Sequence, residues 1–351
     1  MAINFDLLKR LSETPGVPGL EDRVRALVVG ELKALADDVK VDGLGNVIAT
    51  KPGNGQGRVM IAAHMDEIGF MVLHVDDDGF IKINPFGGFD PRVLLAQRVL
   101  VHGFGGQTLR GVLSTASKPI HLLRPDEVKP PRIEEFYVDT GLPGSRVKEL
   151  VEIGDMVTLD RTAEELGDRV VGKAMDDRVG VFVMIETLRK LQGSKLEADV
   201  VAVATTQEEV GLRGAGTSAF HVEPTVGVAL DVTLALDIPG MSRGEQVSQL
   251  GGGASIGVAN SSVISNPKLV KHFRQIAKDR QILHQVDILP RGGTDAAAIQ
   301  RSRGGVPSIT LSVPARYVHT VNEMVDTRDV QAAIDLLAAY LGQAHAGSYQ
   351  Y

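Results

Sequence analysis

A histidine and two acidic side chains follow closely on one another in the otherwise apolar stretch RVMIAAHMDEIGF. His64 and Asp66 lie two residues apart, so in an extended backbone they share one face, and the carboxylate can orient or polarise the imidazole. Imidazole and carboxylate groups bind divalent cations and also carry protons. We therefore expect metal or acid/base chemistry at the end of this core strand.

Four further segments place polar side chains where an apolar strand or a helix begins or ends: AMDDRVG, ATTQEEVG, VALDV and YVHTVNE. The candidates that they contribute are Asp176, Glu208, Glu209, Asp231 and His319. Taken singly, an acid at a helix start is often a cap, and a histidine after a strand is often only hydrogen-bonded. Ligand sites of open α/β sheets lie beyond the carboxyl ends of the strands, so the five segments together favour one shared site.

The adjacent carboxylates of Glu208 and Glu209 repel each other in apolar surroundings unless cations lie near them. A pair of divalent cations removes that conflict. Three carboxylate ligands and two neutral imidazoles around two such ions leave a surplus of about one positive charge, which a bound hydroxide neutralises. The chain has no Cys, so any metal must be held by nitrogen and oxygen.

The elements that position these residues follow from the periodicity of the sequence. A helix is predicted over 24–39, whereas residues 68–167 alternate short strands with turns and predict a compact β-domain. Helices and strands then alternate again, and the last helix is expected to begin with Thr327 as its N-cap. At 351 residues the chain suits two domains. We expect one discontinuous α/β domain, residues 1–67 and 168–351, interrupted by a β insert at 68–167.

Composition excludes several classes of function. Net charge −7 without a block of basic residues argues against a nucleic-acid partner. No apolar run approaches the roughly 20 residues that span a bilayer, so no membrane partner is expected. The first residues, MAINFDLLKR, lack an apolar segment for secretion, which makes a cytoplasmic location the expectation.

The motifs AHMDEIGF, GKAMDDRVG, TTQEEVGLRGA, ALDV, RGGTDAAAI and ARYVHT occur in this order. In that combination the chain resembles the tetrahedral (glutamyl or deblocking) aminopeptidases, which are dinuclear metallopeptidases, and the resemblance covers nearly the whole sequence. It implies a phosphorylase/hydrolase-like α/β catalytic domain with an inserted β-barrel-like dimerisation domain. It also implies dimers joined through the insert and assembled into a tetrahedral homododecamer.

The resemblance implies a role for each candidate residue. His64 and Asp231 would hold one divalent cation, Glu209 and His319 a second, and Asp176 both, with zinc or cobalt as the ions. Glu208 matches the general acid/base that activates a water lying between the metals, and Asp66 matches the carboxylate behind His64. The implied activity is removal of N-terminal residues from short peptides.

Other functions remain open at this point. Related dimetal folds remove acyl groups from amino acids, and some relatives have been described as endoglucanases. A glycosidase needs two carboxylates about 5 to 9.5 Å apart across the sugar, which the neighbouring Glu208 and Glu209 fit poorly. A binding protein that kept the fold would be expected to have lost a ligand or the base, and none is lost. Lys173, Arg291 and Arg316 could each face an acidic substrate residue or form a structural ion pair.

Overall fold

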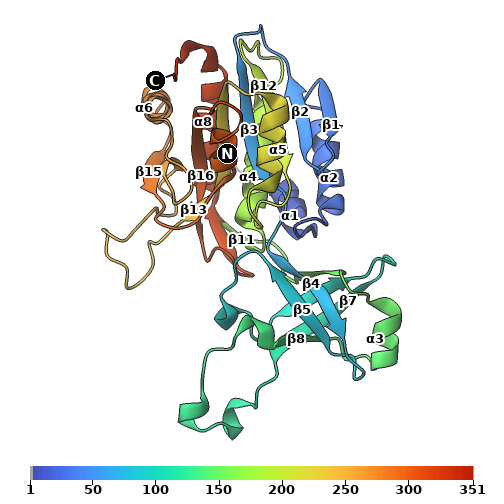
Figure 1. The fold of residues 1–351 in the computed structure, drawn as a ribbon. Coiled ribbons are helices and arrows are strands. Elements are labelled where there is room, and N and C mark those ends of the chain that lie inside the picture. The colour runs from blue at the N-terminus through green and yellow to red at the C-terminus, as the bar shows by residue number, and fades with distance from the viewer. Residues whose placement is uncertain (1–2, 351) are drawn as a thin grey trace.

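Within residues 3–350, which the computed structural model describes, eleven strands form one twisted sheet (Figure 1). Its order is β1 (Asp38–Val41), β2 (Val47–Lys51), β12 (Asp199–Thr205), β3 (Arg58–His64), β13 (Val226–Leu234), β16 (Ser308–Arg316), β17 (Glu323–Asp326), β11 (Arg169–Gly172) and β10 (Glu164–Leu166). Two more strands branch from this path, because β14 (Ala254–Ala259) pairs with β16 and β15 (His284–Ile288) pairs with β14.

The four central strands, β12, β3, β13 and β16, run parallel to one another. Successive side chains of a strand point to opposite faces, and both faces of β3 are apolar. Val59, Ile61 and Ala63 join the large core cluster on one face, while Met60 and Ala62 join a second cluster on the other. Burial on both faces is typical of parallel strands, and it brings the carboxyl ends of all four strands to one edge of the sheet.

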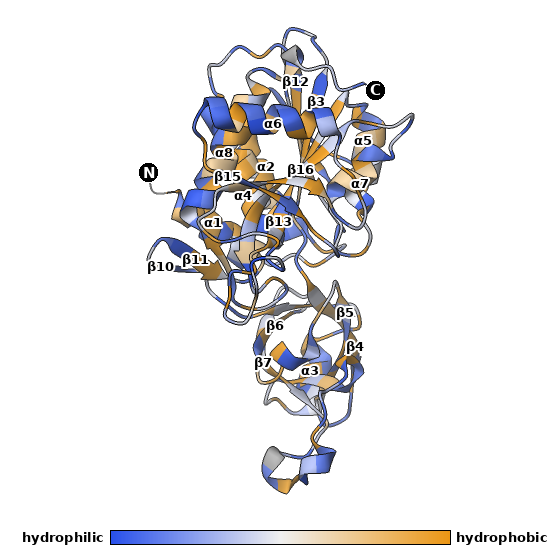
Figure 2. Ribbon diagram, turned by 90° about the vertical axis from the view of Figure 1, so that its left-hand side faces the viewer, coloured by the Kyte–Doolittle hydropathy of each residue, from blue (hydrophilic) through white to orange (hydrophobic). Residues whose placement is uncertain are grey.

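Helices cover both faces of the sheet, and Figure 2 shows them on either side of its strands. The first face carries α1 (Phe5–Glu13), α2 (Asp22–Leu32), α4 (Met175–Lys190), α6 (Pro267–Asp279) and α8 (Thr327–Leu341). The second face carries α5 (Arg213–Val222) and α7 (Asp295–Gln300). None of the helices within residues 3–350 is long and apolar enough to cross a bilayer.

A closed barrel is inserted between β3 and β10 and lies below the sheet in Figure 1. Its strands are β4 (Gly69–Val75), β5 (Ile81–Phe86), β8 (Phe136–Asp139), β7 (Thr108–Thr115), β6 (Arg98–His102) and β9 (Met156–Leu159). The barrel has its own hydrophobic core, to which Phe70, Val101 and Val157 belong. Its remaining elements are α3 (Gly144–Leu150) and the short 3-10 turns η1 (Pro91–Val93), η2 (Ile120–Leu122), η3 (Pro125–Glu127) and η4 (Ile133–Glu135).

The predicted α/β fold with a β insert is confirmed, but several elements differ from the expectation. The first predicted helix ends at Leu32, because the residues Asp38–Val41 pair with β2 as a strand. The helices α1, α5 and α7 were not predicted. The N-cap of α8 is Asp326 rather than Thr327, since the Asp326 side chain accepts the N–H of Arg328 at 3.0 Å.

Candidate metal centre

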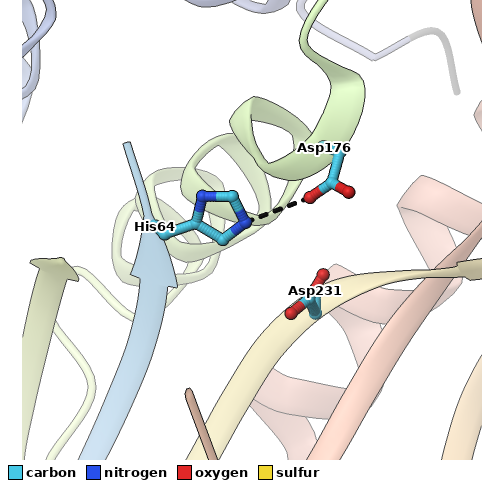
Figure 3. Close-up of side chains that lie close together, drawn as sticks. All are labelled: His64, Asp176 and Asp231. Atoms are coloured by element: carbon cyan, nitrogen blue, oxygen red, sulfur yellow. Dashed lines mark hydrogen bonds and ion pairs between the residues drawn. The ribbon is translucent and has the colours of Figure 1, made fainter. Parts of the chain in front are cut away.

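The five expected metal ligands come from separate elements and meet at the carboxyl edge of the sheet. His64 ends β3, Asp231 lies in β13, and Asp176 stands at the start of α4. Glu209 follows β12 and His319 follows β16. All five line one cavity together with Glu208, the expected general base. Figure 3 shows His64, Asp176 and Asp231 pointing toward one another from a strand, a helix and a second strand.

The two carboxylate oxygens of Asp176 face different histidines. Oδ1 lies 3.0 Å from Nε2 of His64, and Oδ2 lies 3.3 Å from Nε2 of His319. Ligand atoms of His64, Asp176 and Asp231 lie within 4.8 Å of one another, and so do those of Asp176, Glu209 and His319. Asp176 therefore belongs to two ligand groups at once.

Both histidines present the same nitrogen to this cluster because their other nitrogen is engaged. His64 Nδ1 lies 3.0 Å from the backbone oxygen of Asp66, and His319 Nδ1 lies 2.7 Å from the backbone oxygen of Gly88. A carbonyl oxygen can only accept, so Nδ1 donates its proton there and Nε2 is the nitrogen left to face the cluster. A lone pair on Nε2 is what a metal ligand requires.

Asp66 holds the loop that carries the two glutamates. Its Oδ1 accepts the N–H of Glu208 at 3.0 Å, and its Oδ2 accepts the N–H of Glu209 at 3.1 Å. Oδ1 also lies 3.6 Å from Nδ1 of His64. The fully buried carboxylate therefore contacts His64 and fixes the backbone of its two acidic neighbours at the same time.

Burial and like charges dominate the electrostatics of the cluster. Burial, together with neighbouring acids such as Asp231, raises the pKa of Glu208 well above its usual range. Burial and the neighbouring Asp177 and Asp176 raise the pKa of Asp231 in the same way. Burial disfavours a charged His319, but Asp176 and Glu209 outweigh it and raise its pKa to about 12. The described residues therefore supply too little positive charge to balance the acids of this cluster.

The donor set fits divalent cations. Oε1 of Glu209 is buried and accepts no hydrogen bond from the described residues, although it lies 3.3 Å from His319 Nε2. Buried acceptors without donors are costly unless a cation or another partner satisfies them. The ligand atoms are two imidazole nitrogens and carboxylate oxygens, which suit zinc, cobalt or manganese.

Several contacts of the site were not anticipated from the sequence. Asp177 accepts the backbone N–H of His64 at 3.1 Å. Glu323 accepts the backbone N–H groups of Asp176 and His319. The contact of Gly88 with His319 comes from the inserted segment. Glu323 falls within the segment YVHTVNE, but contacts to backbone amides leave no pattern in the types of side chain.

The three basic residues that the sequence left as candidates for contact with an acidic substrate residue differ in their partners and in their position relative to the cavity. Lys173 is buried and lies 2.5 Å from Glu67, and Arg316 pairs with Asp237 at 3.1 Å. Arg291 lines the cavity of the candidate ligands, and no ion pair joins it to an acid within residues 3–350. Of these three residues, Arg291 alone lines the cavity in the described part of the chain.

Comparison with known proteins identifies the family. The family model described as M42 glutamyl aminopeptidase matches residues 45–336. The lysyl aminopeptidase of Pyrococcus furiosus is 39% identical over 346 residues, which are 97% of each chain. The structure of an aminopeptidase from the archaeon Desulfurococcus kamchatkensis matches with a TM-score of 0.93 at 39% identity, covering 99% of this chain and 97% of that one.

A third similar structure is that of the TET1 peptidase of Pyrococcus horikoshii, which can assemble into a tetrahedron or a large octahedral shell. It matches with a TM-score of 0.86 at 32% identity, covering 96% of this chain and 98% of that one. The resemblance carried by the sequence motifs is thus confirmed along the chain. This protein belongs to the M42 glutamyl aminopeptidase family and is an aminopeptidase.

Proposed function

We propose that the chain hydrolyses N-terminal residues from short peptides with two divalent cations, zinc or cobalt. His64 and Asp231 would hold one cation, Glu209 and His319 the other, and Asp176 both. The observation that carries this proposal is that the two carboxylate oxygens of Asp176 face two different histidines. One cation alone would leave one of the two groups of ligands unused.

When bound, the cations would polarise the scissile carbonyl and lower the pKa of a water from about 15.7 toward 7. Glu208 lines the same cavity and reaches within 3.8 Å of His64 Nε2, so it is placed beside the cations. We assign it the general-base role, in which its carboxylate takes the proton of the attacking water and returns it to the departing amine. Asp66, through the backbone of Glu208 and Glu209, would keep the base and the ligand pointing in their separate directions.

The assay that tests this function offers a panel of short peptides, acyl-amino acids and soluble glucans to the protein, with and without added divalent cation. We expect release of free N-terminal amino acids from the peptides and no turnover of the other two classes. Preferential release from acyl-amino acids would favour a deacylase of the same fold, and release of reducing sugar would favour a glycosidase.

We further propose that Arg291 selects substrates with an acidic N-terminal residue. Replacing Arg291 by Ala should lower kcat/KM for peptides that begin with Glu by about tenfold. A tenfold loss corresponds to the lower end of the ~1.5–3 kcal/mol that a hydrogen bond to a charged group typically contributes. We expect the lower end because the Arg291 side chain is exposed. Peptides that begin with Leu should be cleaved as by the wild type.

A matched control for this variant is Arg274→Ala, because Arg274 is also exposed but does not line the cavity of the metal ligands. It should cleave both kinds of peptide at the wild-type rates. An unchanged ratio of kcat/KM between Glu and Leu substrates in Arg291→Ala would contradict the assignment.

The barrel is proposed to be a separate dimerisation domain, residues 68–167, within a tetrahedral dodecamer. Two observations support this: the barrel has its own core, and it exposes large apolar side chains such as Phe104 and Ile153, which are 65% and 71% exposed. The related TET1 peptidase can assemble into a tetrahedron, and also into a large octahedral shell. Light scattering of the intact protein should give the mass of a dodecamer, with a dimer as the intermediate. A monomer across the micromolar range would contradict the assembly and leave the metal chemistry untouched.

A further inference from the structure

Glu323 is a buried acid that touches two of the proposed ligands without lining their cavity. It is the first residue of β17 and is 1% exposed. Its Oε2 accepts the backbone N–H of Asp176 at 2.9 Å, and its Oε1 accepts the backbone N–H of His319 at 2.7 Å. One carboxylate thus joins two segments that are far apart in the sequence.

Both of these segments have irregular backbone. Asp176 has φ −77° and ψ 107°, which are not helical values, although it lies in the first turn of α4. His319 has φ 63°, in the left-handed region that non-glycine residues seldom adopt, and Tyr317, two residues before it, has φ 60°. Neither amide is engaged in a regular helix or strand ladder, so the position of each ligand depends on the side chain that receives its N–H.

The strand that carries Glu323 is anchored on both sides. β17 pairs with β11 through Glu323 and the residues that follow it, and with β16 through Met324 and Val325. An acceptor on such a strand has a fixed place relative to the sheet. The two oxygens of Glu323 therefore fix the backbone of Asp176 and the backbone of His319 relative to each other.

We propose that Glu323 is a positioning residue that sets the spacing between the shared ligand Asp176 and the ligand His319. This rests on the proposed dinuclear site. The distance that it controls is the 3.3 Å between Asp176 Oδ2 and His319 Nε2. Removing partners that orient metal ligands typically lowers metal affinity by about 10- to 100-fold. The loss should fall mainly on the cation held by His319 and Glu209, because His64 and Asp231 make no hydrogen bond to Glu323.

The informative variant is Glu323→Gln. A glutamine amide has the size of the carboxylate but only one accepting oxygen, and its NH₂ group cannot receive a second N–H. One of the two backbone amides would then face a donor, and the spacing between the ligands would no longer be held.

A matched control is Asp329→Asn. Asp329 is also fully buried and also accepts two backbone N–H groups, those of Gly251 and Gly253, at 2.7 Å each. Neither glycine is a proposed ligand. Both variants therefore lose stability for the same reason, because each replaces a buried carboxylate that accepts two backbone N–H groups.

The experiment titrates cobalt into the metal-free full-length proteins and follows calorimetry and the visible absorption of bound cobalt. Glu323→Gln should bind the second cobalt about 10- to 100-fold more weakly and change its spectrum. Asp329→Asn should bind both ions as the wild type does, even if both variants unfold at a lower temperature. Wild-type affinities and spectrum in Glu323→Gln would overturn the proposal.

A further variant covers the case in which Glu323→Gln does not fold. Glu323→Asp keeps the charge and both acceptors but is shorter by one methylene, so it too should weaken the second cobalt, and wild-type binding by it would overturn the proposal. If the wild-type protein binds only one cobalt ion or none, the dinuclear function itself fails, and the positioning role fails with it.

Discussion

Replacing Glu208 by Gln is expected to lower kcat by at least ~10²-fold, the usual contribution of a positioned acid or base, while both cations stay bound. Glutamine keeps the size of the side chain but cannot take a proton from water. The ligand groups that contain Asp176 are complete without Glu208. Stopped assays with Leu- and Glu-peptides, together with metal analysis of the same samples, measure the two effects separately.

The neighbouring residue supplies the matched control, because Glu209 has the same chemistry, a similar burial and the same loop. Glu209→Gln should weaken metal binding as well as turnover, since the Oε1 of Glu209 faces His319 Nε2 at 3.3 Å. If the two variants bind metal and turn over alike, the division of roles between base and ligand is wrong.

Prolonged chelation is expected to abolish peptidase activity, and zinc or cobalt should restore it. Without cations the cluster lacks the charge that would polarise a carbonyl, and burial raises the pKa of Glu208 and Asp231, which disfavours their charged forms. Ligands that bind only the folded state stabilise it, so the midpoint of thermal unfolding should fall on chelation and recover with metal.

The control for chelation is a sample that passes through the same buffers with zinc returned before the assay. Recovery of activity in that sample separates loss of metal from damage to the protein. A sample that keeps full activity after its metal has been removed would contradict metal dependence.

The grouping of the proposed ligands could largely be predicted from the sequence because these residues sit where core elements begin or end. His64 is the last residue of a strand that is apolar on both faces, and Asp231 lies in the second half of another. Polar residues at such places stand out against their surroundings, and parallel strands bring them to one edge. The alternation of these apolar strands with helices predicted the α/β fold, and the run of short strands predicted the β insert.

The rest of the site depends on contacts that have no sequence pattern. Asp66 was expected behind His64, yet its two oxygens also receive the amides of Glu208 and Glu209. β3 ends at His64, so Asp66 no longer follows the alternation of a strand, and its direction is set by the loop that it binds. The left-handed backbone conformation of His319 could not be predicted either, because the type of side chain does not determine it.

Ion pairs and short helices were also beyond prediction. Lys173 and Arg316 find their partners Glu67 and Asp237 only in the folded chain, which left Arg291 as the basic residue of the cavity. The helix α7 has six residues, too few for a helical period to emerge. Asp326 replaces Thr327 as the cap because β17 runs directly into α8.

The most direct test of the dinuclear site is the metal content of freshly purified, active protein, measured by elemental analysis against the concentration of chains. The proposed ligands predict two divalent cations per chain, and the single variants His64→Ala and His319→Ala should each lose one of them preferentially. Fully active protein that contains only one bound divalent cation per chain, or none, would contradict the dinuclear site.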